Sequence, residues 1–176
     1  MPKPFGYIYL DLPEHKYERV TTNELHYTVD ISRYAVLNRP EDYDSGWIDI
    51  VYSDLDANFQ ATIQMTYIPV NNDKNKLRLL LDDAHKLVYK HHVRATSIEQ
   101  EVIENSNGVQ FVFITISGEV PTSFQFYTLN SKDHFLRGAL YFPTALANDY
   151  LAPIIEYIKI DIRHMLSTIQ WKNTIS

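Results

Sequence analysis

"FQATIQMTYIPVNNDKNKLRLLLDDAHKLV", residues Phe59–Val88, changes from one hydrophobic period to another, and this change decides the fold class. From Phe59 to Tyr67 apolar and polar residues alternate, which is the period of a strand with one buried face. The apolar set of that strand is Phe59, Ala61, Ile63, Met65 and Tyr67. After "NND", a candidate helix N-cap, apolar residues recur at helical spacing. These residues are Leu77, Leu80, Leu81, Ala84, Leu87 and Val88. A strand followed by a helix is therefore predicted.

Three more strands are predicted before this stretch. They are "GYIYLDLP" at 6–13, "LHYTVDISRYAVL" at 25–37 and "GWIDIVYS" at 46–53. The third is separated from Phe59 by the turn-forming "DLDAN", so it and the strand at 59–67 are expected to form a hairpin.

Strands also dominate the part of the chain after the helix. They are expected around Ile98–Ile103, in "VQFVFITISG", in "SFQFYTL" and in "HFLRGALYF", with a turn at "NSNG". A second helix is expected from about Asn148 to Trp171, with one apolar stripe formed by Leu151, Ile155, Ile158, Ile162, Met165 and Ile169. We therefore predict a single α+β domain over residues 1–176, with a largely antiparallel sheet of about 7–8 strands and two main helices packed on it.

Composition excludes several classes of protein. The net charge is -6, and an acidic surface is not the clustered basic footprint that nucleic acid requires. Hydrophobic residues make up 45% of the chain, typical of a globular domain, and no apolar run is long enough for a transmembrane helix. The absence of cysteine excludes disulfides and thiolate metal sites.

The stretch "SKDHFLRGALYFP", residues 131–143, gathers an acid, a histidine and an arginine near a glycine. Strand alternation places His134 and Arg137 on opposite faces, so they cannot serve one substrate together. We therefore interpret the stretch as a turn and a strand. Arg137 is expected to anchor a carboxylate or backbone carbonyls of a neighbouring element, because an arginine among apolar neighbours needs its donors satisfied.

The candidate metal-binding motifs of the sequence are incomplete. Asp54, Asp56 and Asn58 resemble the start of a calcium loop, but Phe59 and Met65 stand where an EF-hand needs glycine and glutamate. The histidines His85, His91 and His92 lack the spacing that places two imidazoles on adjacent helical turns. We expect no metal site, no cofactor and no catalytic residue.

Four stretches together resemble the GldD family of gliding-motility-associated lipoproteins of Bacteroidetes-type bacteria. They are "PKPFGYIYLDLPEHKY", "DDAHKLVYKHHVRATSIEQEVI", "SFQFYTLNSKDHFLRGALYF" and "DYLAPIIEYIKIDIRHMLSTIQWK", and they extend over about Pro2–Lys172. Residues that match the most characteristic motif are His134, Phe135, Leu136, Arg137, Gly138 and Ala139, and those that match the opening motif are Pro4, Gly6 and Tyr7. They are candidate structural or partner-binding positions. Among several α+β layouts, the element order also fits a PsbP-like one.

The resemblance implies a non-enzymatic, periplasm-facing lipoprotein of the cell envelope, needed for gliding motility and the associated type IX secretion. Its partners would be envelope proteins of the gliding or secretion machinery, and it would contact the membrane only through a lipid anchor. The 176 residues contain neither a cysteine nor a recognisable signal peptide, so we expect the lipidated segment to lie outside this sequence.

Two alternatives stay open from the sequence. One is a small-ligand or glycan-binding envelope domain, which could include an undetected hydrolase activity. Tyrosine and tryptophan rings stack on sugars, and the residues considered for this role are Tyr7, Tyr9, Trp47, Tyr52 and Tyr67. The other alternative is a purely structural role in positioning the lipoprotein.

Overall fold

The computed structural model describes residues 11–41, 46–53, 55, 60–89, 95–118, 122–129, 131–142 and 148–172. The strands that it describes are β1 (Tyr17–Val20), β2 (Tyr27–Ser32), β3 (Ala35–Asn38), β4 (Trp47–Tyr52), β5 (Ala61–Pro69), β6 (Ala95–Glu104), β7 (Gln110–Gly118), β8 (Thr122–Leu129), β9 (His134–Tyr141) and β10 (Gln170–Trp171). The helices are α1 (Lys74–Tyr89) and α2 (Asn148–Thr168). The predicted order of strands, helix, strands and helix is confirmed, with a short strand added after α2.

The main sheet has seven strands in the order β3-β4-β5-β9-β8-β7-β6, and every neighbouring pair is antiparallel. β4 and β5 form the predicted hairpin. The last strand of the sheet in sequence, β9, lies between β5 and β8 and joins the strands before α1 to those after it. The predicted α+β class with a largely antiparallel sheet is therefore confirmed.

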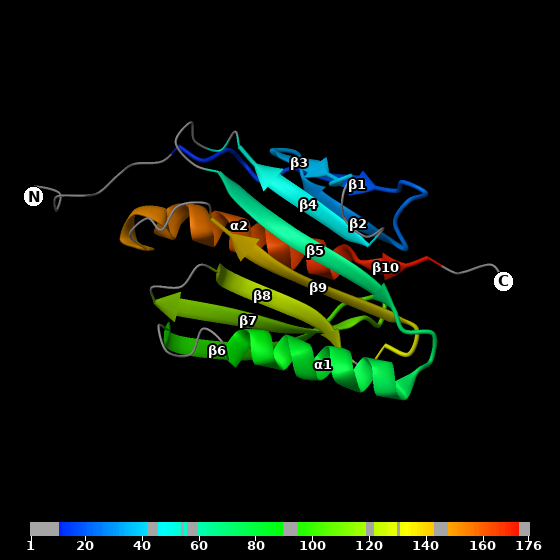
Figure 1. Cartoon of the computed structure of the whole chain (residues 1–176). Helices are drawn as coiled ribbons and strands as arrows, with labels where there is room; N and C mark the ends of the chain where they lie inside the picture. The colour runs from blue at the N-terminus through cyan, green and yellow to red at the C-terminus, as the bar shows by residue number, and fades with distance from the viewer. Residues whose placement is uncertain are drawn as a thin grey trace, which may run out of the picture.

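The two helices cover opposite faces of the main sheet (Figure 1). On β9, Leu136 and Leu140 belong to the large core that contains Ile158 and Ile162 of α2. Phe135, next in sequence to Leu136, instead packs with Ala84 of α1. α2 therefore lies over one face, and α1 lies over part of the other.

A second, three-stranded sheet of order β1-β2-β10 lies beside α2. Its central strand, β2, contributes Tyr27 and Val29 to the same core that α2 covers. β10 pairs with β2 immediately after α2 ends, which places Trp171 opposite Tyr27. The small sheet and α2 thus form one layer against the main sheet.

One predicted strand is wrong as a single element. The stretch 25–37 forms β2 and β3, which belong to different sheets and are separated by a turn. The hydroxyl of Ser32 accepts a hydrogen bond from the Tyr34 backbone N–H at 3.1 Å, a side-chain contact that stabilises a turn. The strand predicted at 6–13 falls mostly on residues 1–10, outside the described residues, and Asp11 and Leu12 are not in a strand.

The helices begin and end for identifiable reasons. Asp73 accepts hydrogen bonds from the backbone N–H groups of Asn75 and Lys76, which confirms "NND" as the N-cap region of α1. α2 ends at Thr168, before the predicted end near Trp171, because the chain turns there to pair with β2. Among the described residues, neither helix has the length and apolar character to cross a bilayer.

Candidate functional site

The six positions His134–Ala139 occupy most of β9, the central strand that joins the two halves of the main sheet. β5 and β8 flank this strand, so its side chains point alternately to the two faces of the sheet. His134, Leu136 and Gly138 lie on the face covered by α2, and Phe135, Arg137 and Ala139 lie on the face of α1. The prediction that His134 and Arg137 point to opposite faces is confirmed.

His134 takes part in a ring cluster on the α2 side of the sheet. Its Nδ1 accepts a hydrogen bond of 2.6 Å from the Tyr67 hydroxyl if the ring is protonated at Nε2, and its ring stacks on Trp171 at 4.5 Å. Burial lowers the pKa of His134, although the nearby Asp133 carboxylate opposes this effect. A neutral imidazole that links β5, β9 and β10 is suited to a structural role.

Gly138 leaves room for an aromatic ring of the core. A Cβ at this position would lie 2.3 Å from Cζ of Phe126, which is 2% exposed and cannot simply turn away. Leu136 is fully buried on the same face. Gly138 and Leu136 are therefore packing positions rather than binding positions.

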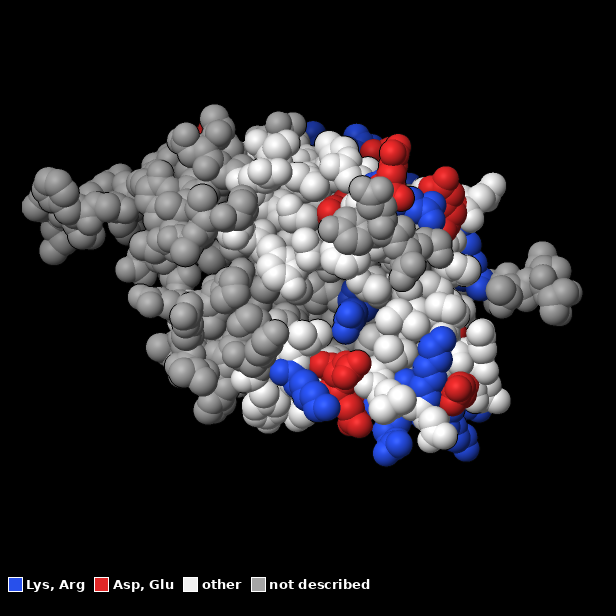
Figure 2. Space-filling view, in the orientation of Figure 1, with Lys and Arg blue, Asp and Glu red and all other residues white. Residues whose placement is uncertain are grey.

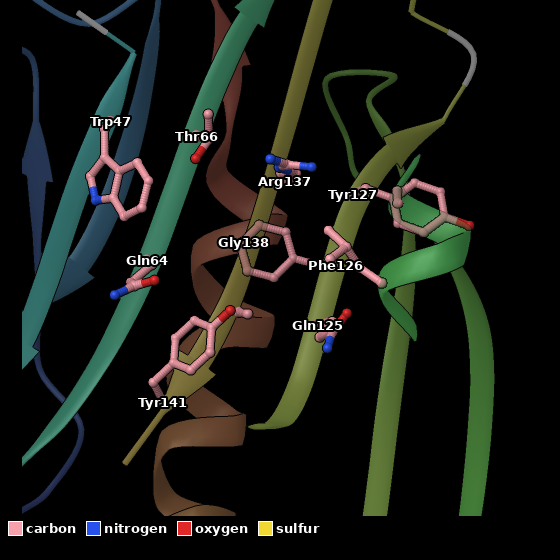
Figure 3. A pocket seen from close by; sticks show the side chains of 12 residues that line it. Trp47, Gln64, Thr66, Gln125, Phe126, Tyr127, Arg137, Gly138 and Tyr141 are labelled. Carbon is pink, nitrogen blue, oxygen red and sulfur yellow. The ribbon is translucent and has the colours of Figure 1, made fainter. Parts of the chain in front are cut away.

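On the other face, α1 covers only part of the main sheet. Phe135 is fully buried beneath this helix with Val70 and Ala84. The next side chains on this face, Arg137 and Ala139, lie beside the helix rather than beneath it and line a groove of about 240 Å³ (Figure 3). This central groove is lined by side chains that include Trp47, Gln64, Thr66, Ala84, Leu87, Gln125, Tyr127, Arg137, Ala139 and Tyr141.

Cross-strand rows explain the shape of the central groove. One row runs Trp47, Thr66, Arg137, Tyr127 across β4, β5, β9 and β8. In the next row Ala139 lies between Gln64 and Gln125. Because Ala139 has a small side chain among longer neighbours, it forms the floor of the hollow. Figure 3 shows the rings of Trp47 and Tyr127 at its two sides, with Arg137 between them.

The electrostatics of the central groove are dominated by Arg137. In the part of the chain that the structure describes, no side chain or backbone group accepts a hydrogen bond or ion pair from its guanidinium. The carboxylate or carbonyl partner expected from the sequence is therefore not found among these residues. Burial raises the pKa of Tyr141, and the positive charge of the nearby Arg137 opposes that rise.

A second polar cluster, centred on Asp161, was missed in the sequence. Asp161 is 3% exposed, and its two carboxylate oxygens contact His15 Nδ1 at 2.7 Å, Tyr17 at 3.0 Å and Tyr52 at 2.9 Å. Desolvation and the Asp161 charge raise the pKa values of both tyrosines. A signal was present, because Asp161 lies three residues after Ile158 and four after Tyr157, within the buried face of α2.

This cluster holds distant parts of the chain together. His15 stacks on Tyr157 of α2 at 4.1 Å, and Tyr17 stacks on His164 of the same helix at 3.6 Å. The carboxylate is thus satisfied by donors from β1, β4 and the segment before β1. The arrangement meets the requirement that a buried charge be hydrogen-bonded, and it suits a structural tie.

The remaining predicted residues do not form one site. Pro4, Gly6, Tyr7 and Tyr9 lie outside the described residues. Of the aromatic set proposed for sugar binding, Tyr52 and Tyr67 are buried at 2% and 7% exposure in the core on the α2 side, whereas Trp47 lines the central groove. These three rings therefore share no groove and do not form one sugar-binding surface.

Most of the candidate metal ligands lie outside the described residues. Asp54, Asp56, Asn58, Phe59, His91 and His92 lie outside the described residues. His85 is on α1 with its ring 4.6 Å from that of Tyr89. Within the described ranges, no group of three or more histidine or acidic side chains is placed to hold a metal ion.

Comparisons with known proteins agree with this geometry. A protein-family model described as "Gliding motility lipoprotein GldD" matches residues 1–171, so the resemblance inferred from the motifs is confirmed. The solution structure of cyanobacterial PsbP (CyanoP) from Synechocystis sp. PCC 6803 is similar with a TM-score of 0.50 at 10% identity, over 97% of this chain and 100% of that chain. At this identity the likeness shows the fold alone, which is PsbP-like as expected. The comparison with curated protein sequences gives no match.

Proposed function

Because the chain belongs to the family of gliding motility lipoproteins GldD, we propose that it is a non-enzymatic accessory module that binds partner proteins. The family implies a role related to gliding motility and an association with the cell envelope. The proposal adds that the module faces the periplasm and that its partners belong to the gliding machinery and to the associated type IX secretion system.

The observation that carries this proposal is the central groove on the face of the sheet that α1 leaves partly open. The groove brings together Arg137, Trp47 and two tyrosines, the residue types that contribute most binding energy at protein interfaces. Its rim is formed in part by Leu87 and Tyr141, which are 41% and 36% exposed. Among the described residues, Figure 2 shows few charged side chains over the central strands of this face, which suits a surface that is covered by a partner.

The cluster around Asp161 supports a role without catalysis. A His–Asp pair could orient a general base, but here the carboxylate also accepts hydrogen bonds from Tyr17 and Tyr52. The imidazole of His15 is itself stacked on Tyr157. These contacts connect α2 to the segment before β1, to β1 and to β4, and they account for the buried carboxylate without a substrate.

Affinity capture of the full lipid-anchored protein from detergent-solubilised envelopes, followed by mass spectrometry, tests the module. Gln64→Lys places a long charged side chain in the central groove, and Ile160→Lys adds the same charge on α2, where Ile160 is 50% exposed. We expect one envelope protein to be recovered with the wild type and with Ile160→Lys, and to be lost with Gln64→Lys. Recovery of no envelope protein with the wild type would contradict the proposed function.

A second candidate function is binding of a small polar ligand or a glycan in the same groove. It is favoured by Gln64, whose side-chain amide lies beside Ala139 in the groove and could bond to hydroxyl groups. A glycan array probed with the purified chain tests it. A sugar that binds the wild type but not Gln64→Lys would support this candidate over the first.

A further inference from the structure

We propose that the central groove receives an acidic side chain of a partner polypeptide, and that the carboxylate of this side chain pairs with Arg137. This inference rests on the proposed function, because it specifies how the module recognises its partner. It assigns a role to an arginine whose guanidinium is unpaired within the described residues. It also explains why a small residue lies beside that arginine.

The first argument is the state of Arg137. The side chain is partly buried between Thr66 and Tyr127 in its cross-strand row, yet no described group accepts its hydrogen bonds. Leaving a guanidinium partly desolvated without an acceptor is unfavourable, and its planar array of donors matches a carboxylate in a bidentate geometry. A ligand carboxylate would remove this cost.

The second argument is that the acidic side chain in the adjacent cross-strand row, Asp49, is already engaged. Asp49 lies in the row of Gln64 and Ala139, one row from Arg137 and two strands away from β9. Its carboxylate accepts a hydrogen bond of 2.8 Å from the indole N–H of Trp47. Asp49 therefore orients the Trp47 ring at the side of the groove and leaves Arg137 for another acceptor.

The third argument is the size of the groove. Its volume of about 240 Å³ lies below the range of ~300–1,000 Å³ typical of sites that enclose a whole small ligand. A single glutamate or aspartate side chain fits such a hollow above Ala139. Gln64 and Thr66 offer further donors to a carboxylate or to the backbone that carries it.

The fourth argument is the rim, which favours a polypeptide over a free acid or an acidic sugar. Leu87 on α1 and Tyr141 at the end of β9 are exposed apolar side chains beside the hollow. A partner segment would bury both while its acidic side chain enters between them. The interface would thus have a charged centre and an apolar surround that excludes water, as interface hot spots do.

The test is site-specific photo-crosslinking in cells that produce the full lipid-anchored protein. A benzoylphenylalanine at Leu87 reports on the rim, and the same residue at Ile160 on α2 is the control for an exposed position behind the sheet. We expect a discrete crosslinked protein from position 87 and none of that product from position 160. The crosslinked peptide should contain an aspartate or glutamate close to the attachment point.

Two variants separate charge from shape. Arg137→Gln removes the charge and keeps a polar side chain, and Ala139→Leu fills the floor of the groove and keeps the charge. We expect each to reduce the crosslink at least tenfold while the thermal unfolding temperature stays close to that of the wild type. Arg137→Glu should also abolish the crosslink, and replacing the acidic residue of the partner by arginine should restore it.

The outcomes distinguish this inference from the proposed function. A folded Arg137→Gln variant with an undiminished crosslink, or a crosslinked peptide without an acidic residue, overturns the inference. If affinity capture recovers an envelope partner but position 87 gives no crosslink, the proposed function is retained. In that case the assignment of the central groove as the binding site is wrong. If position 87 gives no crosslink and the purified chain binds glucuronate through Arg137, the ligand is an acidic sugar, and the polypeptide assignment is wrong.

Discussion

Asp161 is a buried charged residue whose hydrogen bonds depend on several distant parts of the chain. It is almost completely buried, and its carboxylate contacts three donors that come from three separate parts of the chain. A buried carboxylate of this kind is stable only while all of its hydrogen bonds are kept. Its replacement therefore measures how strongly α2 is tied to β1 and β4.

Asp161→Asn should lower the free energy of unfolding by about 2–4 kcal/mol, because an amide nitrogen cannot accept the bonds that one carboxylate oxygen accepts. Urea unfolding at neutral pH, followed by circular dichroism, provides the measurement. Asp30→Asn is the matched control, since Asp30 contacts Arg19 and His164, whose side chains are 54% and 35% exposed. We expect the control to lose less than ~1 kcal/mol. Equal losses in both variants would contradict the assignment.

At the residue scale, the orientation of the characteristic motif could be predicted, but its surroundings could not. Alternation along one strand was enough to separate His134 from Arg137. The central groove needs Gln64 from β5 and Gln125 from β8 on either side of Ala139, and these meet only through the register of three strands. Register between distant strands is set by packing of the whole sheet, which a single sequence does not display.

The turn between β6 and β7 supplies hydrogen bonds to the end of α2. Asn105 in this turn is buried, and its side-chain N–H₂ donates to the carbonyls of Leu166 and Ile169 at 3.0 and 2.9 Å. Its side-chain oxygen accepts from the backbone N–H groups of Asn107 and Val109. One amide thus shapes the turn and satisfies one carbonyl in the last turn of α2 and one just after the helix, where carbonyls have no helical partner.

Asn105→Asp keeps the side-chain acceptor but replaces the N–H₂ donor by a carboxylate oxygen that faces two carbonyl oxygens. We therefore expect the free energy of unfolding to fall by about 2–4 kcal/mol at pH 7. Contact with carbonyl oxygens would raise the folded-state pKa of the new carboxyl above its unfolded value. The folded state then binds the proton more tightly, so the difference from wild type should shrink as pH falls through that raised pKa. Urea unfolding of both proteins between pH 7 and pH 4 measures this difference.

The control for this prediction is Asn107→Asp in the same turn. Asn107 is exposed and its side chain donates to the Ile169 carbonyl at 3.2 Å, so water can replace the lost bond. Its effect should stay below ~1 kcal/mol and depend little on pH. A large, pH-dependent loss at position 107 would show that burial at position 105 is not the cause.

Helices and strands could be predicted where the local sequence pattern alone determines the secondary structure. The alternation of residues 61–67 and the helical spacing after Asp73 were sufficient for β5 and α1. The stretch 25–37 alternates without a strong break, so the turn between β2 and β3 was missed. β10 has two residues and exists because Trp171 pairs opposite Tyr27, a long-range contact with no local signal.

At the scale of the whole molecule, the small sheet, α2 and the main sheet share one hydrophobic core. Tyr27 and Val29 of β2, Ile162 of α2, and Ile63 and Leu136 of the main sheet all belong to it. Neither sheet can lose its contacts with this core without exposing apolar side chains of the other. We therefore expect residues 1–176 to unfold as one cooperative unit, as the predicted single domain requires.

The two tryptophans allow this prediction to be measured, because Trp47 lies in the main sheet and Trp171 in the small one. Trp171→Phe leaves fluorescence that reports on the main sheet, and Trp47→Phe leaves fluorescence that reports on the small sheet. Within each variant, the urea midpoint from fluorescence should coincide with that from circular dichroism. An earlier fluorescence midpoint for Trp171 alone would show that the small sheet separates first and that the unit is not cooperative.

The position of β9 has a consequence for the order in which the chain can assemble. Residues 134–141 are late in the sequence, yet they form the strand between β5 and β8. Until those residues are present, β5 and β8 each have an open edge able to pair with another chain. A polypeptide that crossed a membrane from its amino end would have two separate groups of strands, β3-β4-β5 and β8-β7-β6, until β9 followed. For a chain that crosses a membrane in this way, chaperone protection should thus matter most just before His134 emerges.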